Sequence, residues 1–84
     1  MTYAVFILPS AEKDCNRLSP DVYKRCRKAI LKLEGDPRPA GCKKLVGEDG
    51  YRLRVGDYRV LYRIDDSLKR IFIYRIKHRR EVYR

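Results

Sequence analysis

The stretch YRLRVGDYRVLYRI, residues 51–64, decides the fold of this chain. Apolar and basic residues alternate along it with the period of two that is typical of a β-strand. Gly56-Asp57 interrupts the alternation, and two residues with glycine first form a common hairpin turn. The stretch therefore predicts an antiparallel β-hairpin.

This hairpin predicts two chemically different faces, because residues paired across an antiparallel ladder project from the same side. If the turn closes at Gly56-Asp57, Arg54 lies opposite Arg59. One face is then apolar and carries Tyr51, Leu53, Val60 and Tyr62. The other face gathers Arg52, Arg54 and Arg59. Like charges that face each other repel, so this face is either a solvated outer surface or a binding site for an anion.

The segments before the hairpin predict a strand and two helices. Residues 3–8 (YAVFIL) form an apolar, strand-forming run that Pro9 ends. A short helix follows, with Glu12 and Asp14 expected in its first turn, where they favour the helix dipole. Ser19 followed by Pro20 is an N-cap with proline at the first helical position and opens a second helix. The apolar stripe of that helix is Val22, Cys26, Ala29, Ile30 and Leu33, and its outward-facing cations are Lys24, Arg25, Arg27, Lys28 and Lys32.

The remaining segments complete an α+β fold. Residues 35–41 (GDPRPAG) are interpreted as a connecting loop without chemistry of its own, and residues 42–46 as a brief strand. Residues 70–76 are apolar on both faces, as expected of a central strand. We therefore expect a single domain over residues 1–84: an N-terminal strand and a helical hairpin packed on one face of a small, mostly antiparallel sheet. The other face of the sheet is expected to be open.

The charge of the chain indicates a polyanionic partner. There are 21 Lys and Arg residues against 11 Asp and Glu residues, a formal net charge of +10, and nucleic acid is the partner that this excess favours. The cations are interleaved with strand-forming residues, so a membrane partner is not expected. No signal peptide or transmembrane run is evident, and a cytoplasmic location is expected. Three cysteines without ligand spacing predict reduced thiols and neither a metal nor another cofactor.

The C-terminal motifs resemble a known family. GDYRVLYRI (residues 56–64), IFIYRI (71–76) and HRREVYR (78–84), preceded by a strand and two helices, resemble RelE-type toxins of the RelE/ParE superfamily. The resemblance implies a RelE-like, microbial-RNase-like fold and a metal-free endoribonuclease that cuts mRNA in the ribosomal A site and inhibits translation. It also implies a cognate antitoxin that wraps around the toxin, a hetero-oligomer with it, and a monomeric free toxin. The positions that match the family's functional residues are Arg52, Arg54, Arg59, Arg79 and Tyr83. Relatives often have lysine at the positions of Arg52 and Arg54, so this chain lacks an amine that could lose its proton at these two positions.

Elementary chemistry separates the roles of these residues. Cleaving RNA without a metal requires a base for the 2′-hydroxyl, charge stabilisation on the phosphate, and an acid for the leaving 5′-oxygen. Arginine suits only the charge stabilisation, because it keeps its proton. Tyr83 and His78 are therefore the acid–base candidates, followed by Glu48 and Asp49. The residues expected to contact RNA without a chemical role are Lys77, Arg80, Lys28 and Arg25.

Two other functions are compatible with the same residues. A ParE-like toxin of this fold would poison DNA gyrase and would not need the arginine face. A nonenzymatic RNA-binding module would show salt-sensitive affinity for RNA without cleaving it. A site with so few acid–base groups is expected to be slow on free RNA and to need a substrate that the ribosome orients for attack.

Overall fold

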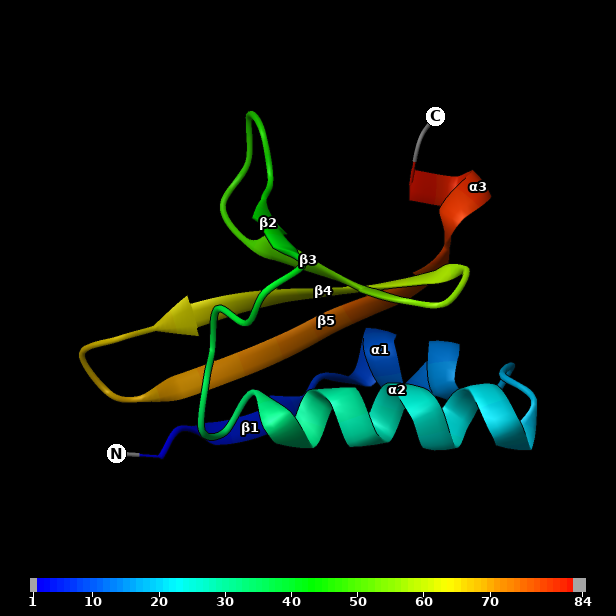
Figure 1. The fold of residues 1–84 in the computed structure, drawn as a ribbon, viewed down its shortest axis with the longest axis horizontal. Helices are drawn as coiled ribbons and strands as arrows, with labels where there is room; N and C mark the ends of the chain where they lie inside the picture. Colours follow the sequence, from blue (N-terminus) through cyan, green and yellow to red (C-terminus); the bar gives the residue numbers. More distant parts are fainter. Residues whose placement is uncertain (1, 83–84) are drawn as a thin grey trace.

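A computed structural model describes residues 2–82 of the chain (Figure 1). The elements in chain order are β1 (Ala4–Ile7), α1 (Pro9–Cys15), α2 (Pro20–Lys32), β2 (Cys42–Lys44), β3 (Tyr51–Val55), β4 (Tyr58–Asp65), β5 (Arg70–His78) and α3 (Arg79–Val82). In the described part the strands form one five-stranded sheet in the order β1-β5-β4-β3-β2. β1 and β5 run parallel, while the other neighbouring strands are antiparallel. The predicted α+β class and the mostly antiparallel sheet are confirmed.

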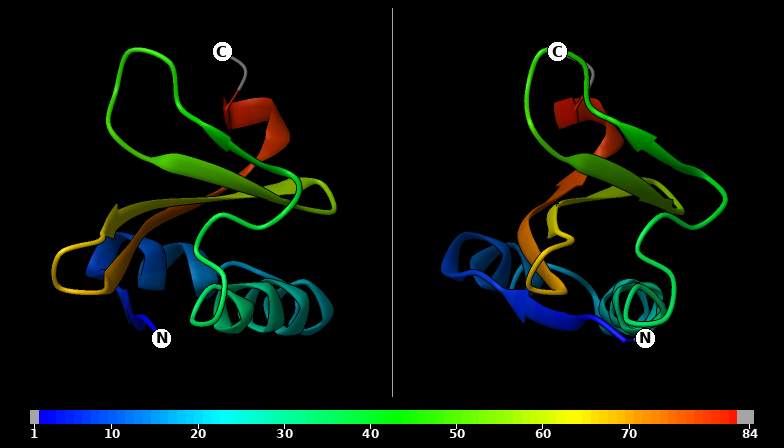
Figure 2. Two further views of the ribbon diagram at one scale, coloured as in Figure 1. Left: turned by 60° about the vertical axis from the view of Figure 1, so that its left-hand side comes forward. Right: turned by 90° about the vertical axis from the view of Figure 1, so that its left-hand side faces the viewer.

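The helices α1 and α2 cover one face of the sheet, as expected (Figures 1 and 2). α2 begins after Ser19, whose hydroxyl accepts a hydrogen bond of 3.4 Å from the backbone N–H of Val22. This confirms the predicted N-cap, which satisfies a backbone donor that the helix itself leaves without a partner. Cys26, Ile30 and Leu33 are the buried residues of the predicted stripe. No described helix is long and apolar enough to cross a bilayer.

The apolar face of the hairpin β3–β4 forms the middle of the core. Val60 and Tyr62 are fully buried, Leu53 is 8 % exposed, and all three pack with Ile71 and Ile73 of β5. The cross-strand pairs Leu53 with Val60 and Arg54 with Arg59 are those that the turn predicts. Gly56 takes a φ of +59° in that turn, a conformation that favours glycine over other residues.

Asp14 has a different place from the one expected. α1 begins at Pro9, so Asp14 lies near the end of the helix, where a negative charge is unfavourable to the helix dipole. Its carboxylate instead accepts hydrogen bonds of 2.8 Å from the backbone N–H of Ile76 and from Nε of Arg75. One turn earlier, the Ser10 hydroxyl donates to the carbonyl of Tyr74 at 2.6 Å. β1 ends before this part of β5, and the side chains of α1 replace the missing strand neighbour.

A β-bulge between β4 and β5 determines which side chains of β5 face which way. Tyr62 pairs with Ile73 but Val60 pairs with Ile76, so β5 has one extra residue at this point. The alternation along β5 therefore reverses, and Ile76 faces the core as Ile73 does. As a consequence, Lys77 pairs with Arg59, while the next residue of β5 projects to the helix-covered side.

The face away from the helices is open only in part. The loop of residues 45–50 rises from this side of the sheet (Figure 1), and a hydrogen bond of 3.0 Å from the Leu45 N–H to the Gly50 carbonyl closes it. Gly50 packs so closely that an added Cβ would lie 3.1 Å from the Tyr74 hydroxyl. The predicted strand over residues 42–46 is also shorter, because the chain leaves the sheet after Lys44 to form this loop. The uncovered part of the face lies toward the β3–β4 turn.

Candidate functional site

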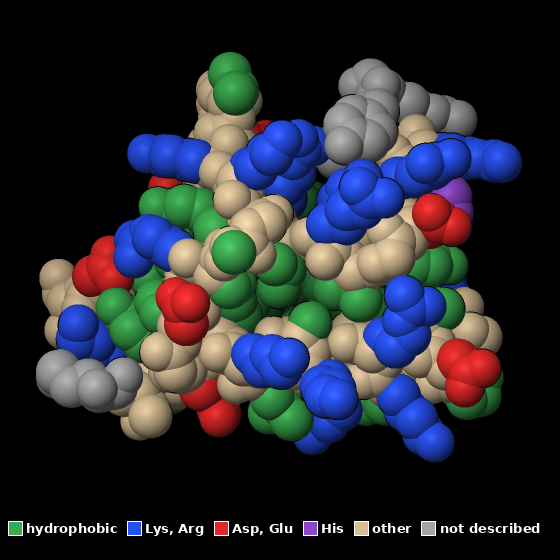
Figure 3. All heavy atoms as spheres, in the orientation of Figure 1, with side chains coloured by type: hydrophobic (Ala, Val, Ile, Leu, Met, Phe, Trp, Pro, Cys, Tyr) green, Lys and Arg blue, Asp and Glu red, His purple; other side chains and the backbone are tan. Residues whose placement is uncertain are grey.

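The uncovered part of the sheet contains a cationic hollow of about 270 Å³. The described residues that line it are Gly41, Lys43, Arg52, Arg54 and Arg59. In the view of Figure 3, Lys and Arg side chains lie both over the hairpin side in the upper half and over the helix side in the lower half. We refer to this feature as the cationic hollow. The strand alternation predicted that its three arginines share one face, and the structure brings them together there.

The β3–β4 turn orients two of these arginines. Arg59 is 5 % exposed, and its Nη1 donates to the carbonyl oxygens of Tyr58 at 3.1 Å and Gly56 at 3.4 Å. Arg54 donates from Nε to the same Gly56 carbonyl at 3.3 Å. One carbonyl dipole thus lies between two like charges that would otherwise repel. Cationic groups held in place before the ligand arrives stabilise new negative charge without further reorganisation.

Lys43 is a member of the hollow to which the sequence analysis assigned no role. Its Cα pairs with that of Arg52, and the neighbouring Cys42 pairs with Leu53 of the core face. β2 therefore adds a cation to the arginine face from an adjacent strand. The sequence signal for Lys43 is weak, since a strand of three residues shows too little alternation to be assigned a face.

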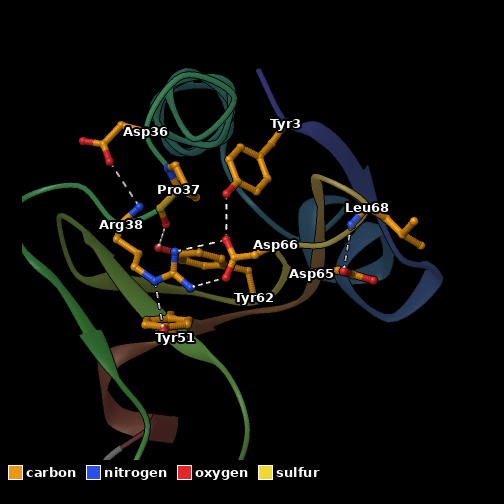
Figure 4. Close-up of polar contacts among 9 residues, drawn as sticks. All are labelled: Tyr3, Asp36, Pro37, Arg38, Tyr51, Tyr62, Asp65, Asp66 and Leu68. Atoms are coloured by element: carbon orange, nitrogen blue, oxygen red, sulfur yellow. Dashed lines mark hydrogen bonds and ion pairs between the residues drawn. The ribbon is translucent and has the colours of Figure 1, made fainter. Parts of the chain in front are cut away.

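The loop of residues 35–41 is anchored more firmly than a simple connection requires (Figure 4). Arg38 forms an ion pair of 2.8 Å with Asp66 and donates from Nε to the Tyr51 hydroxyl at 3.1 Å. The Tyr62 hydroxyl donates to the carbonyl of Pro37 at 2.8 Å. Hydrogen bonds from Arg38 and Tyr3 lower the pKa of Asp66 to about 2, so the carboxylate stays charged. The loop that carries Gly41 to the rim of the hollow is thereby held against the sheet.

His78 does not line the cationic hollow. It pairs with Tyr58 on the helix-covered side of the sheet, with the two rings edge to face at a centroid distance of 5.2 Å. Its Nδ1 accepts a hydrogen bond of 3.3 Å from the backbone N–H of Arg80. It lines a separate hollow with Asp14 and Arg17. The β-bulge of β5 explains this placement, because a regular strand would have put His78 on the other face.

The other predicted site residues are not among the described residues that line the hollow. Lys77 lies on the open face beside Arg59. Arg79 and Arg80 are exposed on α3, and the Arg79 N–H donates to the Asp57 carbonyl at 2.7 Å, which attaches α3 to the hairpin turn. Tyr83 lies outside the described residues.

The predicted RNA contacts on α2 lie on the other side of the sheet. Arg25 and Lys28 are both exposed. The guanidinium of Arg25 reaches the β3–β4 turn, where a Cβ added to Gly56 would lie 2.8 Å from its Nη2. Glu48 and Asp49 belong to the loop over Tyr74, where burial and these two carboxylates raise the pKa of the Tyr74 hydroxyl. Neither carboxylate is among the described residues that line the cationic hollow.

The geometry suits binding of a phosphate and stabilisation of negative charge that develops on it. Guanidinium groups bind phosphate oxygens in pairs, and an ammonium adds a point charge. Over residues 2–82, no group of three or more His, Cys, Asp or Glu side chains is placed to hold a metal ion. Cofactor independence itself stays a prediction.

Comparison with known proteins identifies related chains. Residues 5–83 match the family described as the ParE toxin of the type II toxin–antitoxin system parDE. Toxin RelG of Mycobacterium tuberculosis is 33% identical over 88 aligned residues, which cover 100% of this chain and 99% of RelG. The toxin–antitoxin complex RelBE2 from the same organism contains a similar chain, with a TM-score of 0.84, 30% identity and coverage of 93% and 99% of the two chains. The archaeal RelE–RelB complex from Pyrococcus horikoshii gives a TM-score of 0.83, 36% identity and coverage of 94% and 97%.

Proposed function

This chain belongs to the RelE/ParE superfamily of toxins from type II toxin–antitoxin systems, and on that premise we propose that it is a ribosome-dependent endoribonuclease. Its substrate is messenger RNA in the ribosomal A site, and its cleavage stops translation. The observation that carries this proposal is the cationic hollow, in which Lys43, Arg52, Arg54 and Arg59 converge. Four neighbouring cations repel one another, so this arrangement is costly in a protein that does not bind an anion there.

The hollow supports phosphoryl chemistry by electrostatic stabilisation. Attack of a ribose 2′-oxygen on phosphorus places additional charge on the non-bridging phosphate oxygens, and Arg54 and Arg59 are already oriented by the Gly56 carbonyl. Removing one such donor from a preorganised site typically costs 10² to 10³ in rate. Arg52 completes the arginine set, and Arg79 is proposed to contact the same RNA from α3.

The scarcity of acid–base groups favours dependence on the ribosome. The described lining of the hollow includes neither a carboxylate nor a histidine. Orientation of the 2′-hydroxyl for in-line attack therefore has to come from the substrate complex, and such positioning can supply a large part of the barrier reduction. Tyr83 is proposed as the base for the 2′-hydroxyl, because His78 faces the other side of the sheet.

An antitoxin is the second partner that we propose. Two of the similar solved structures are toxin–antitoxin complexes. With a net charge of +10, this chain calls for a partner segment rich in acidic residues, which would neutralise the hollow on binding. We propose that this complex is the inactive form in the cytoplasm and that release of the antitoxin exposes the hollow.

The proposed activity is tested by primer extension on one mRNA, either bound in ribosomes or free. We expect the purified protein to cut at the A-site codon in the ribosome sample and to leave free mRNA intact. Pre-incubation with the antitoxin should prevent the cut. Absence of a cut in both samples, or equal cutting of free mRNA, would contradict the proposal.

Gyrase poisoning is the second candidate, because the family that residues 5–83 match is described as the ParE toxin. It predicts gyrase-dependent DNA breaks and no transcript cleavage, and a gyrase cleavage assay with the same protein distinguishes it. A nonenzymatic RNA-binding module would instead bind RNA in a salt-sensitive manner and give no product on ribosomes.

A further inference from the structure

Lys43 extends the cationic hollow from a strand outside the hairpin. β2 pairs with β3 so that the Cα atoms of Lys43 and Arg52 are partners, and both side chains line the hollow. The next residue, Lys44, pairs with Tyr51 and is not part of the described lining. Two adjacent lysines of one short strand therefore have different surroundings.

Lysine differs chemically from the arginines beside it. Guanidinium groups keep their protons throughout the ordinary pH range, whereas a lysine ammonium has a lower pKa, ordinarily about 10.4. An ammonium is thus the stronger acid by about two orders of magnitude or more. Of the lining residues that the structure describes, Lys43 is therefore the best proton donor.

Several carboxylates outside the hollow have partners of their own. Asp14 accepts from Arg75, Asp66 pairs with Arg38, and Glu81 accepts from the backbone N–H of His78. The described lining of the hollow contains no carboxylate that would pair with the Lys43 ammonium and compete with a phosphate for it.

We propose that Lys43 is the general acid of the reaction, an inference that rests on the proposed ribonuclease function. As the 2′-oxygen bonds to phosphorus, the bond from phosphorus to the 5′-oxygen breaks, and a proton moves from Nζ of Lys43 to that 5′-oxygen. The products are a 2′,3′-cyclic phosphate, a 5′-hydroxyl and a neutral lysine amine, which regains a proton from water. The 2′-hydroxyl proton passes to Tyr83 or to water. This assignment supplies the transferable proton that Arg52 and Arg54 cannot release at neutral pH.

A sulfur substitution in the substrate tests this role. A 5′-bridging phosphorothiolate at the cleaved linkage has a thiolate leaving group, which departs without protonation. We expect Lys43→Arg to lower the single-turnover rate on ribosome-bound mRNA by about 100-fold with the normal linkage, the lower end of the range for general acid catalysis. With the sulfur linkage we expect Lys43→Arg to stay within about threefold of wild type. Lys44→Ala is the matched control and should behave as wild type on both substrates.

Each other outcome overturns the assignment. A Lys43→Arg variant as fast as wild type on the normal linkage would show that no proton from Lys43 is needed. Equal loss on both substrates would show that Lys43 positions the RNA. If the wild-type protein cuts neither substrate, the proposed ribonuclease function is wrong, and the role of Lys43 is wrong with it. If the wild-type protein cuts but Lys43→Arg shows one of the two patterns above, only the role of Lys43 is wrong.

Discussion

The two faces of the β3–β4 hairpin are made by alternate residues of the same strands, yet they are held in place differently. Val60 is fully buried and its neighbour Arg59 is 5 % exposed, so the two are almost equally inaccessible. Val60 packs in the hydrophobic core, whereas Arg59 donates to the carbonyls of Gly56 and Tyr58 at the rim of the hollow. Burial alone therefore does not distinguish the core from the site, but the type of contact does.

The largest effect should come from the cationic face. Arg59→Ala is expected to lower A-site cleavage by about 100- to 1000-fold, because it removes an oriented charge from the phosphate site. The melting temperature should change little, since the change also removes the repulsion between Arg59 and Arg54. Single-turnover primer extension and thermal unfolding measure the two quantities.

The matched control for this variant is Arg63→Ala. Arg63 lies on the same strand over the Tyr74 ring, outside the described lining of the hollow. Its cleavage rate should stay within about twofold of wild type. Equal losses in both variants would mean that total charge matters and the hollow does not.

The opposite pattern is expected on the core face. Val60→Ala should lower the free energy of unfolding by about 2 kcal/mol, through lost burial and the cavity left behind. The cleavage rate per folded molecule should not change. Urea unfolding measures the change in stability, and the slope of the unfolding free energy against urea concentration should stay the same. Cleavage is assayed at urea concentrations well below the unfolding midpoint. A loss of cleavage rate as large as that of Arg59→Ala would remove the distinction between the two faces.

A pH effect is expected at the helix-covered edge of the sheet. Burial acts to raise the pKa of Asp14, but hydrogen bonds from Arg75 and the Ile76 N–H, with the charges of Arg75 and Arg17, outweigh it and lower the pKa below 3.8. A carboxyl group with a lowered pKa in the folded state stabilises the protein above about pH 4 and loses this contribution as the pH falls through the lowered value. Asp14→Asn should therefore cost about 1 to 2 kcal/mol at pH 7 and reduce the loss of stability on acidification.

Asp66→Asn is the comparison for that measurement. Its ion pair with Arg38 is exposed to solvent, which screens the interaction, so its effect at pH 7 should be smaller than that of Asp14→Asn. Both effects are measured by denaturant unfolding of wild type, Asp14→Asn and Asp66→Asn at several pH values, from pH 7 down to the lowest pH at which wild type is still folded. Identical pH profiles for wild type and Asp14→Asn would contradict the role assigned to Asp14.

The smallest effect is expected at His78. His78→Gln should leave the cleavage rate within about threefold of wild type, because the ring packs on Tyr58 away from the cationic hollow and general acid–base catalysis requires contact with the reacting groups. Its neighbour Lys77 lies on the open face, so Lys77→Gln should weaken binding to programmed ribosomes more than His78→Gln does. A 100-fold loss in His78→Gln would instead return the histidine to the acid–base candidates.

Much of the fold follows from local patterns. The Ser19 cap, the start of α2 at Pro20, the Gly56-Asp57 turn and the register of Arg54 with Arg59 were all predicted and are confirmed. Each depends on residues that are close in sequence, where turn chemistry and strand period act directly. The gathering of Arg52, Arg54 and Arg59 on one face follows from the same short-range rule.

The sequence by itself therefore determined the α+β class, the hairpin and its arginine face. The tertiary structure decided that Lys43 joins these arginines, that His78 does not, and that Asp14 completes the edge of β5. These outcomes depend on the pairing of β2 with β3, on the bulge of β5 opposite Leu61 and Tyr62, and on where β1 ends. All three are contacts between segments far apart in the chain, and a bulge reverses the side-chain alternation that the strand period of two predicts.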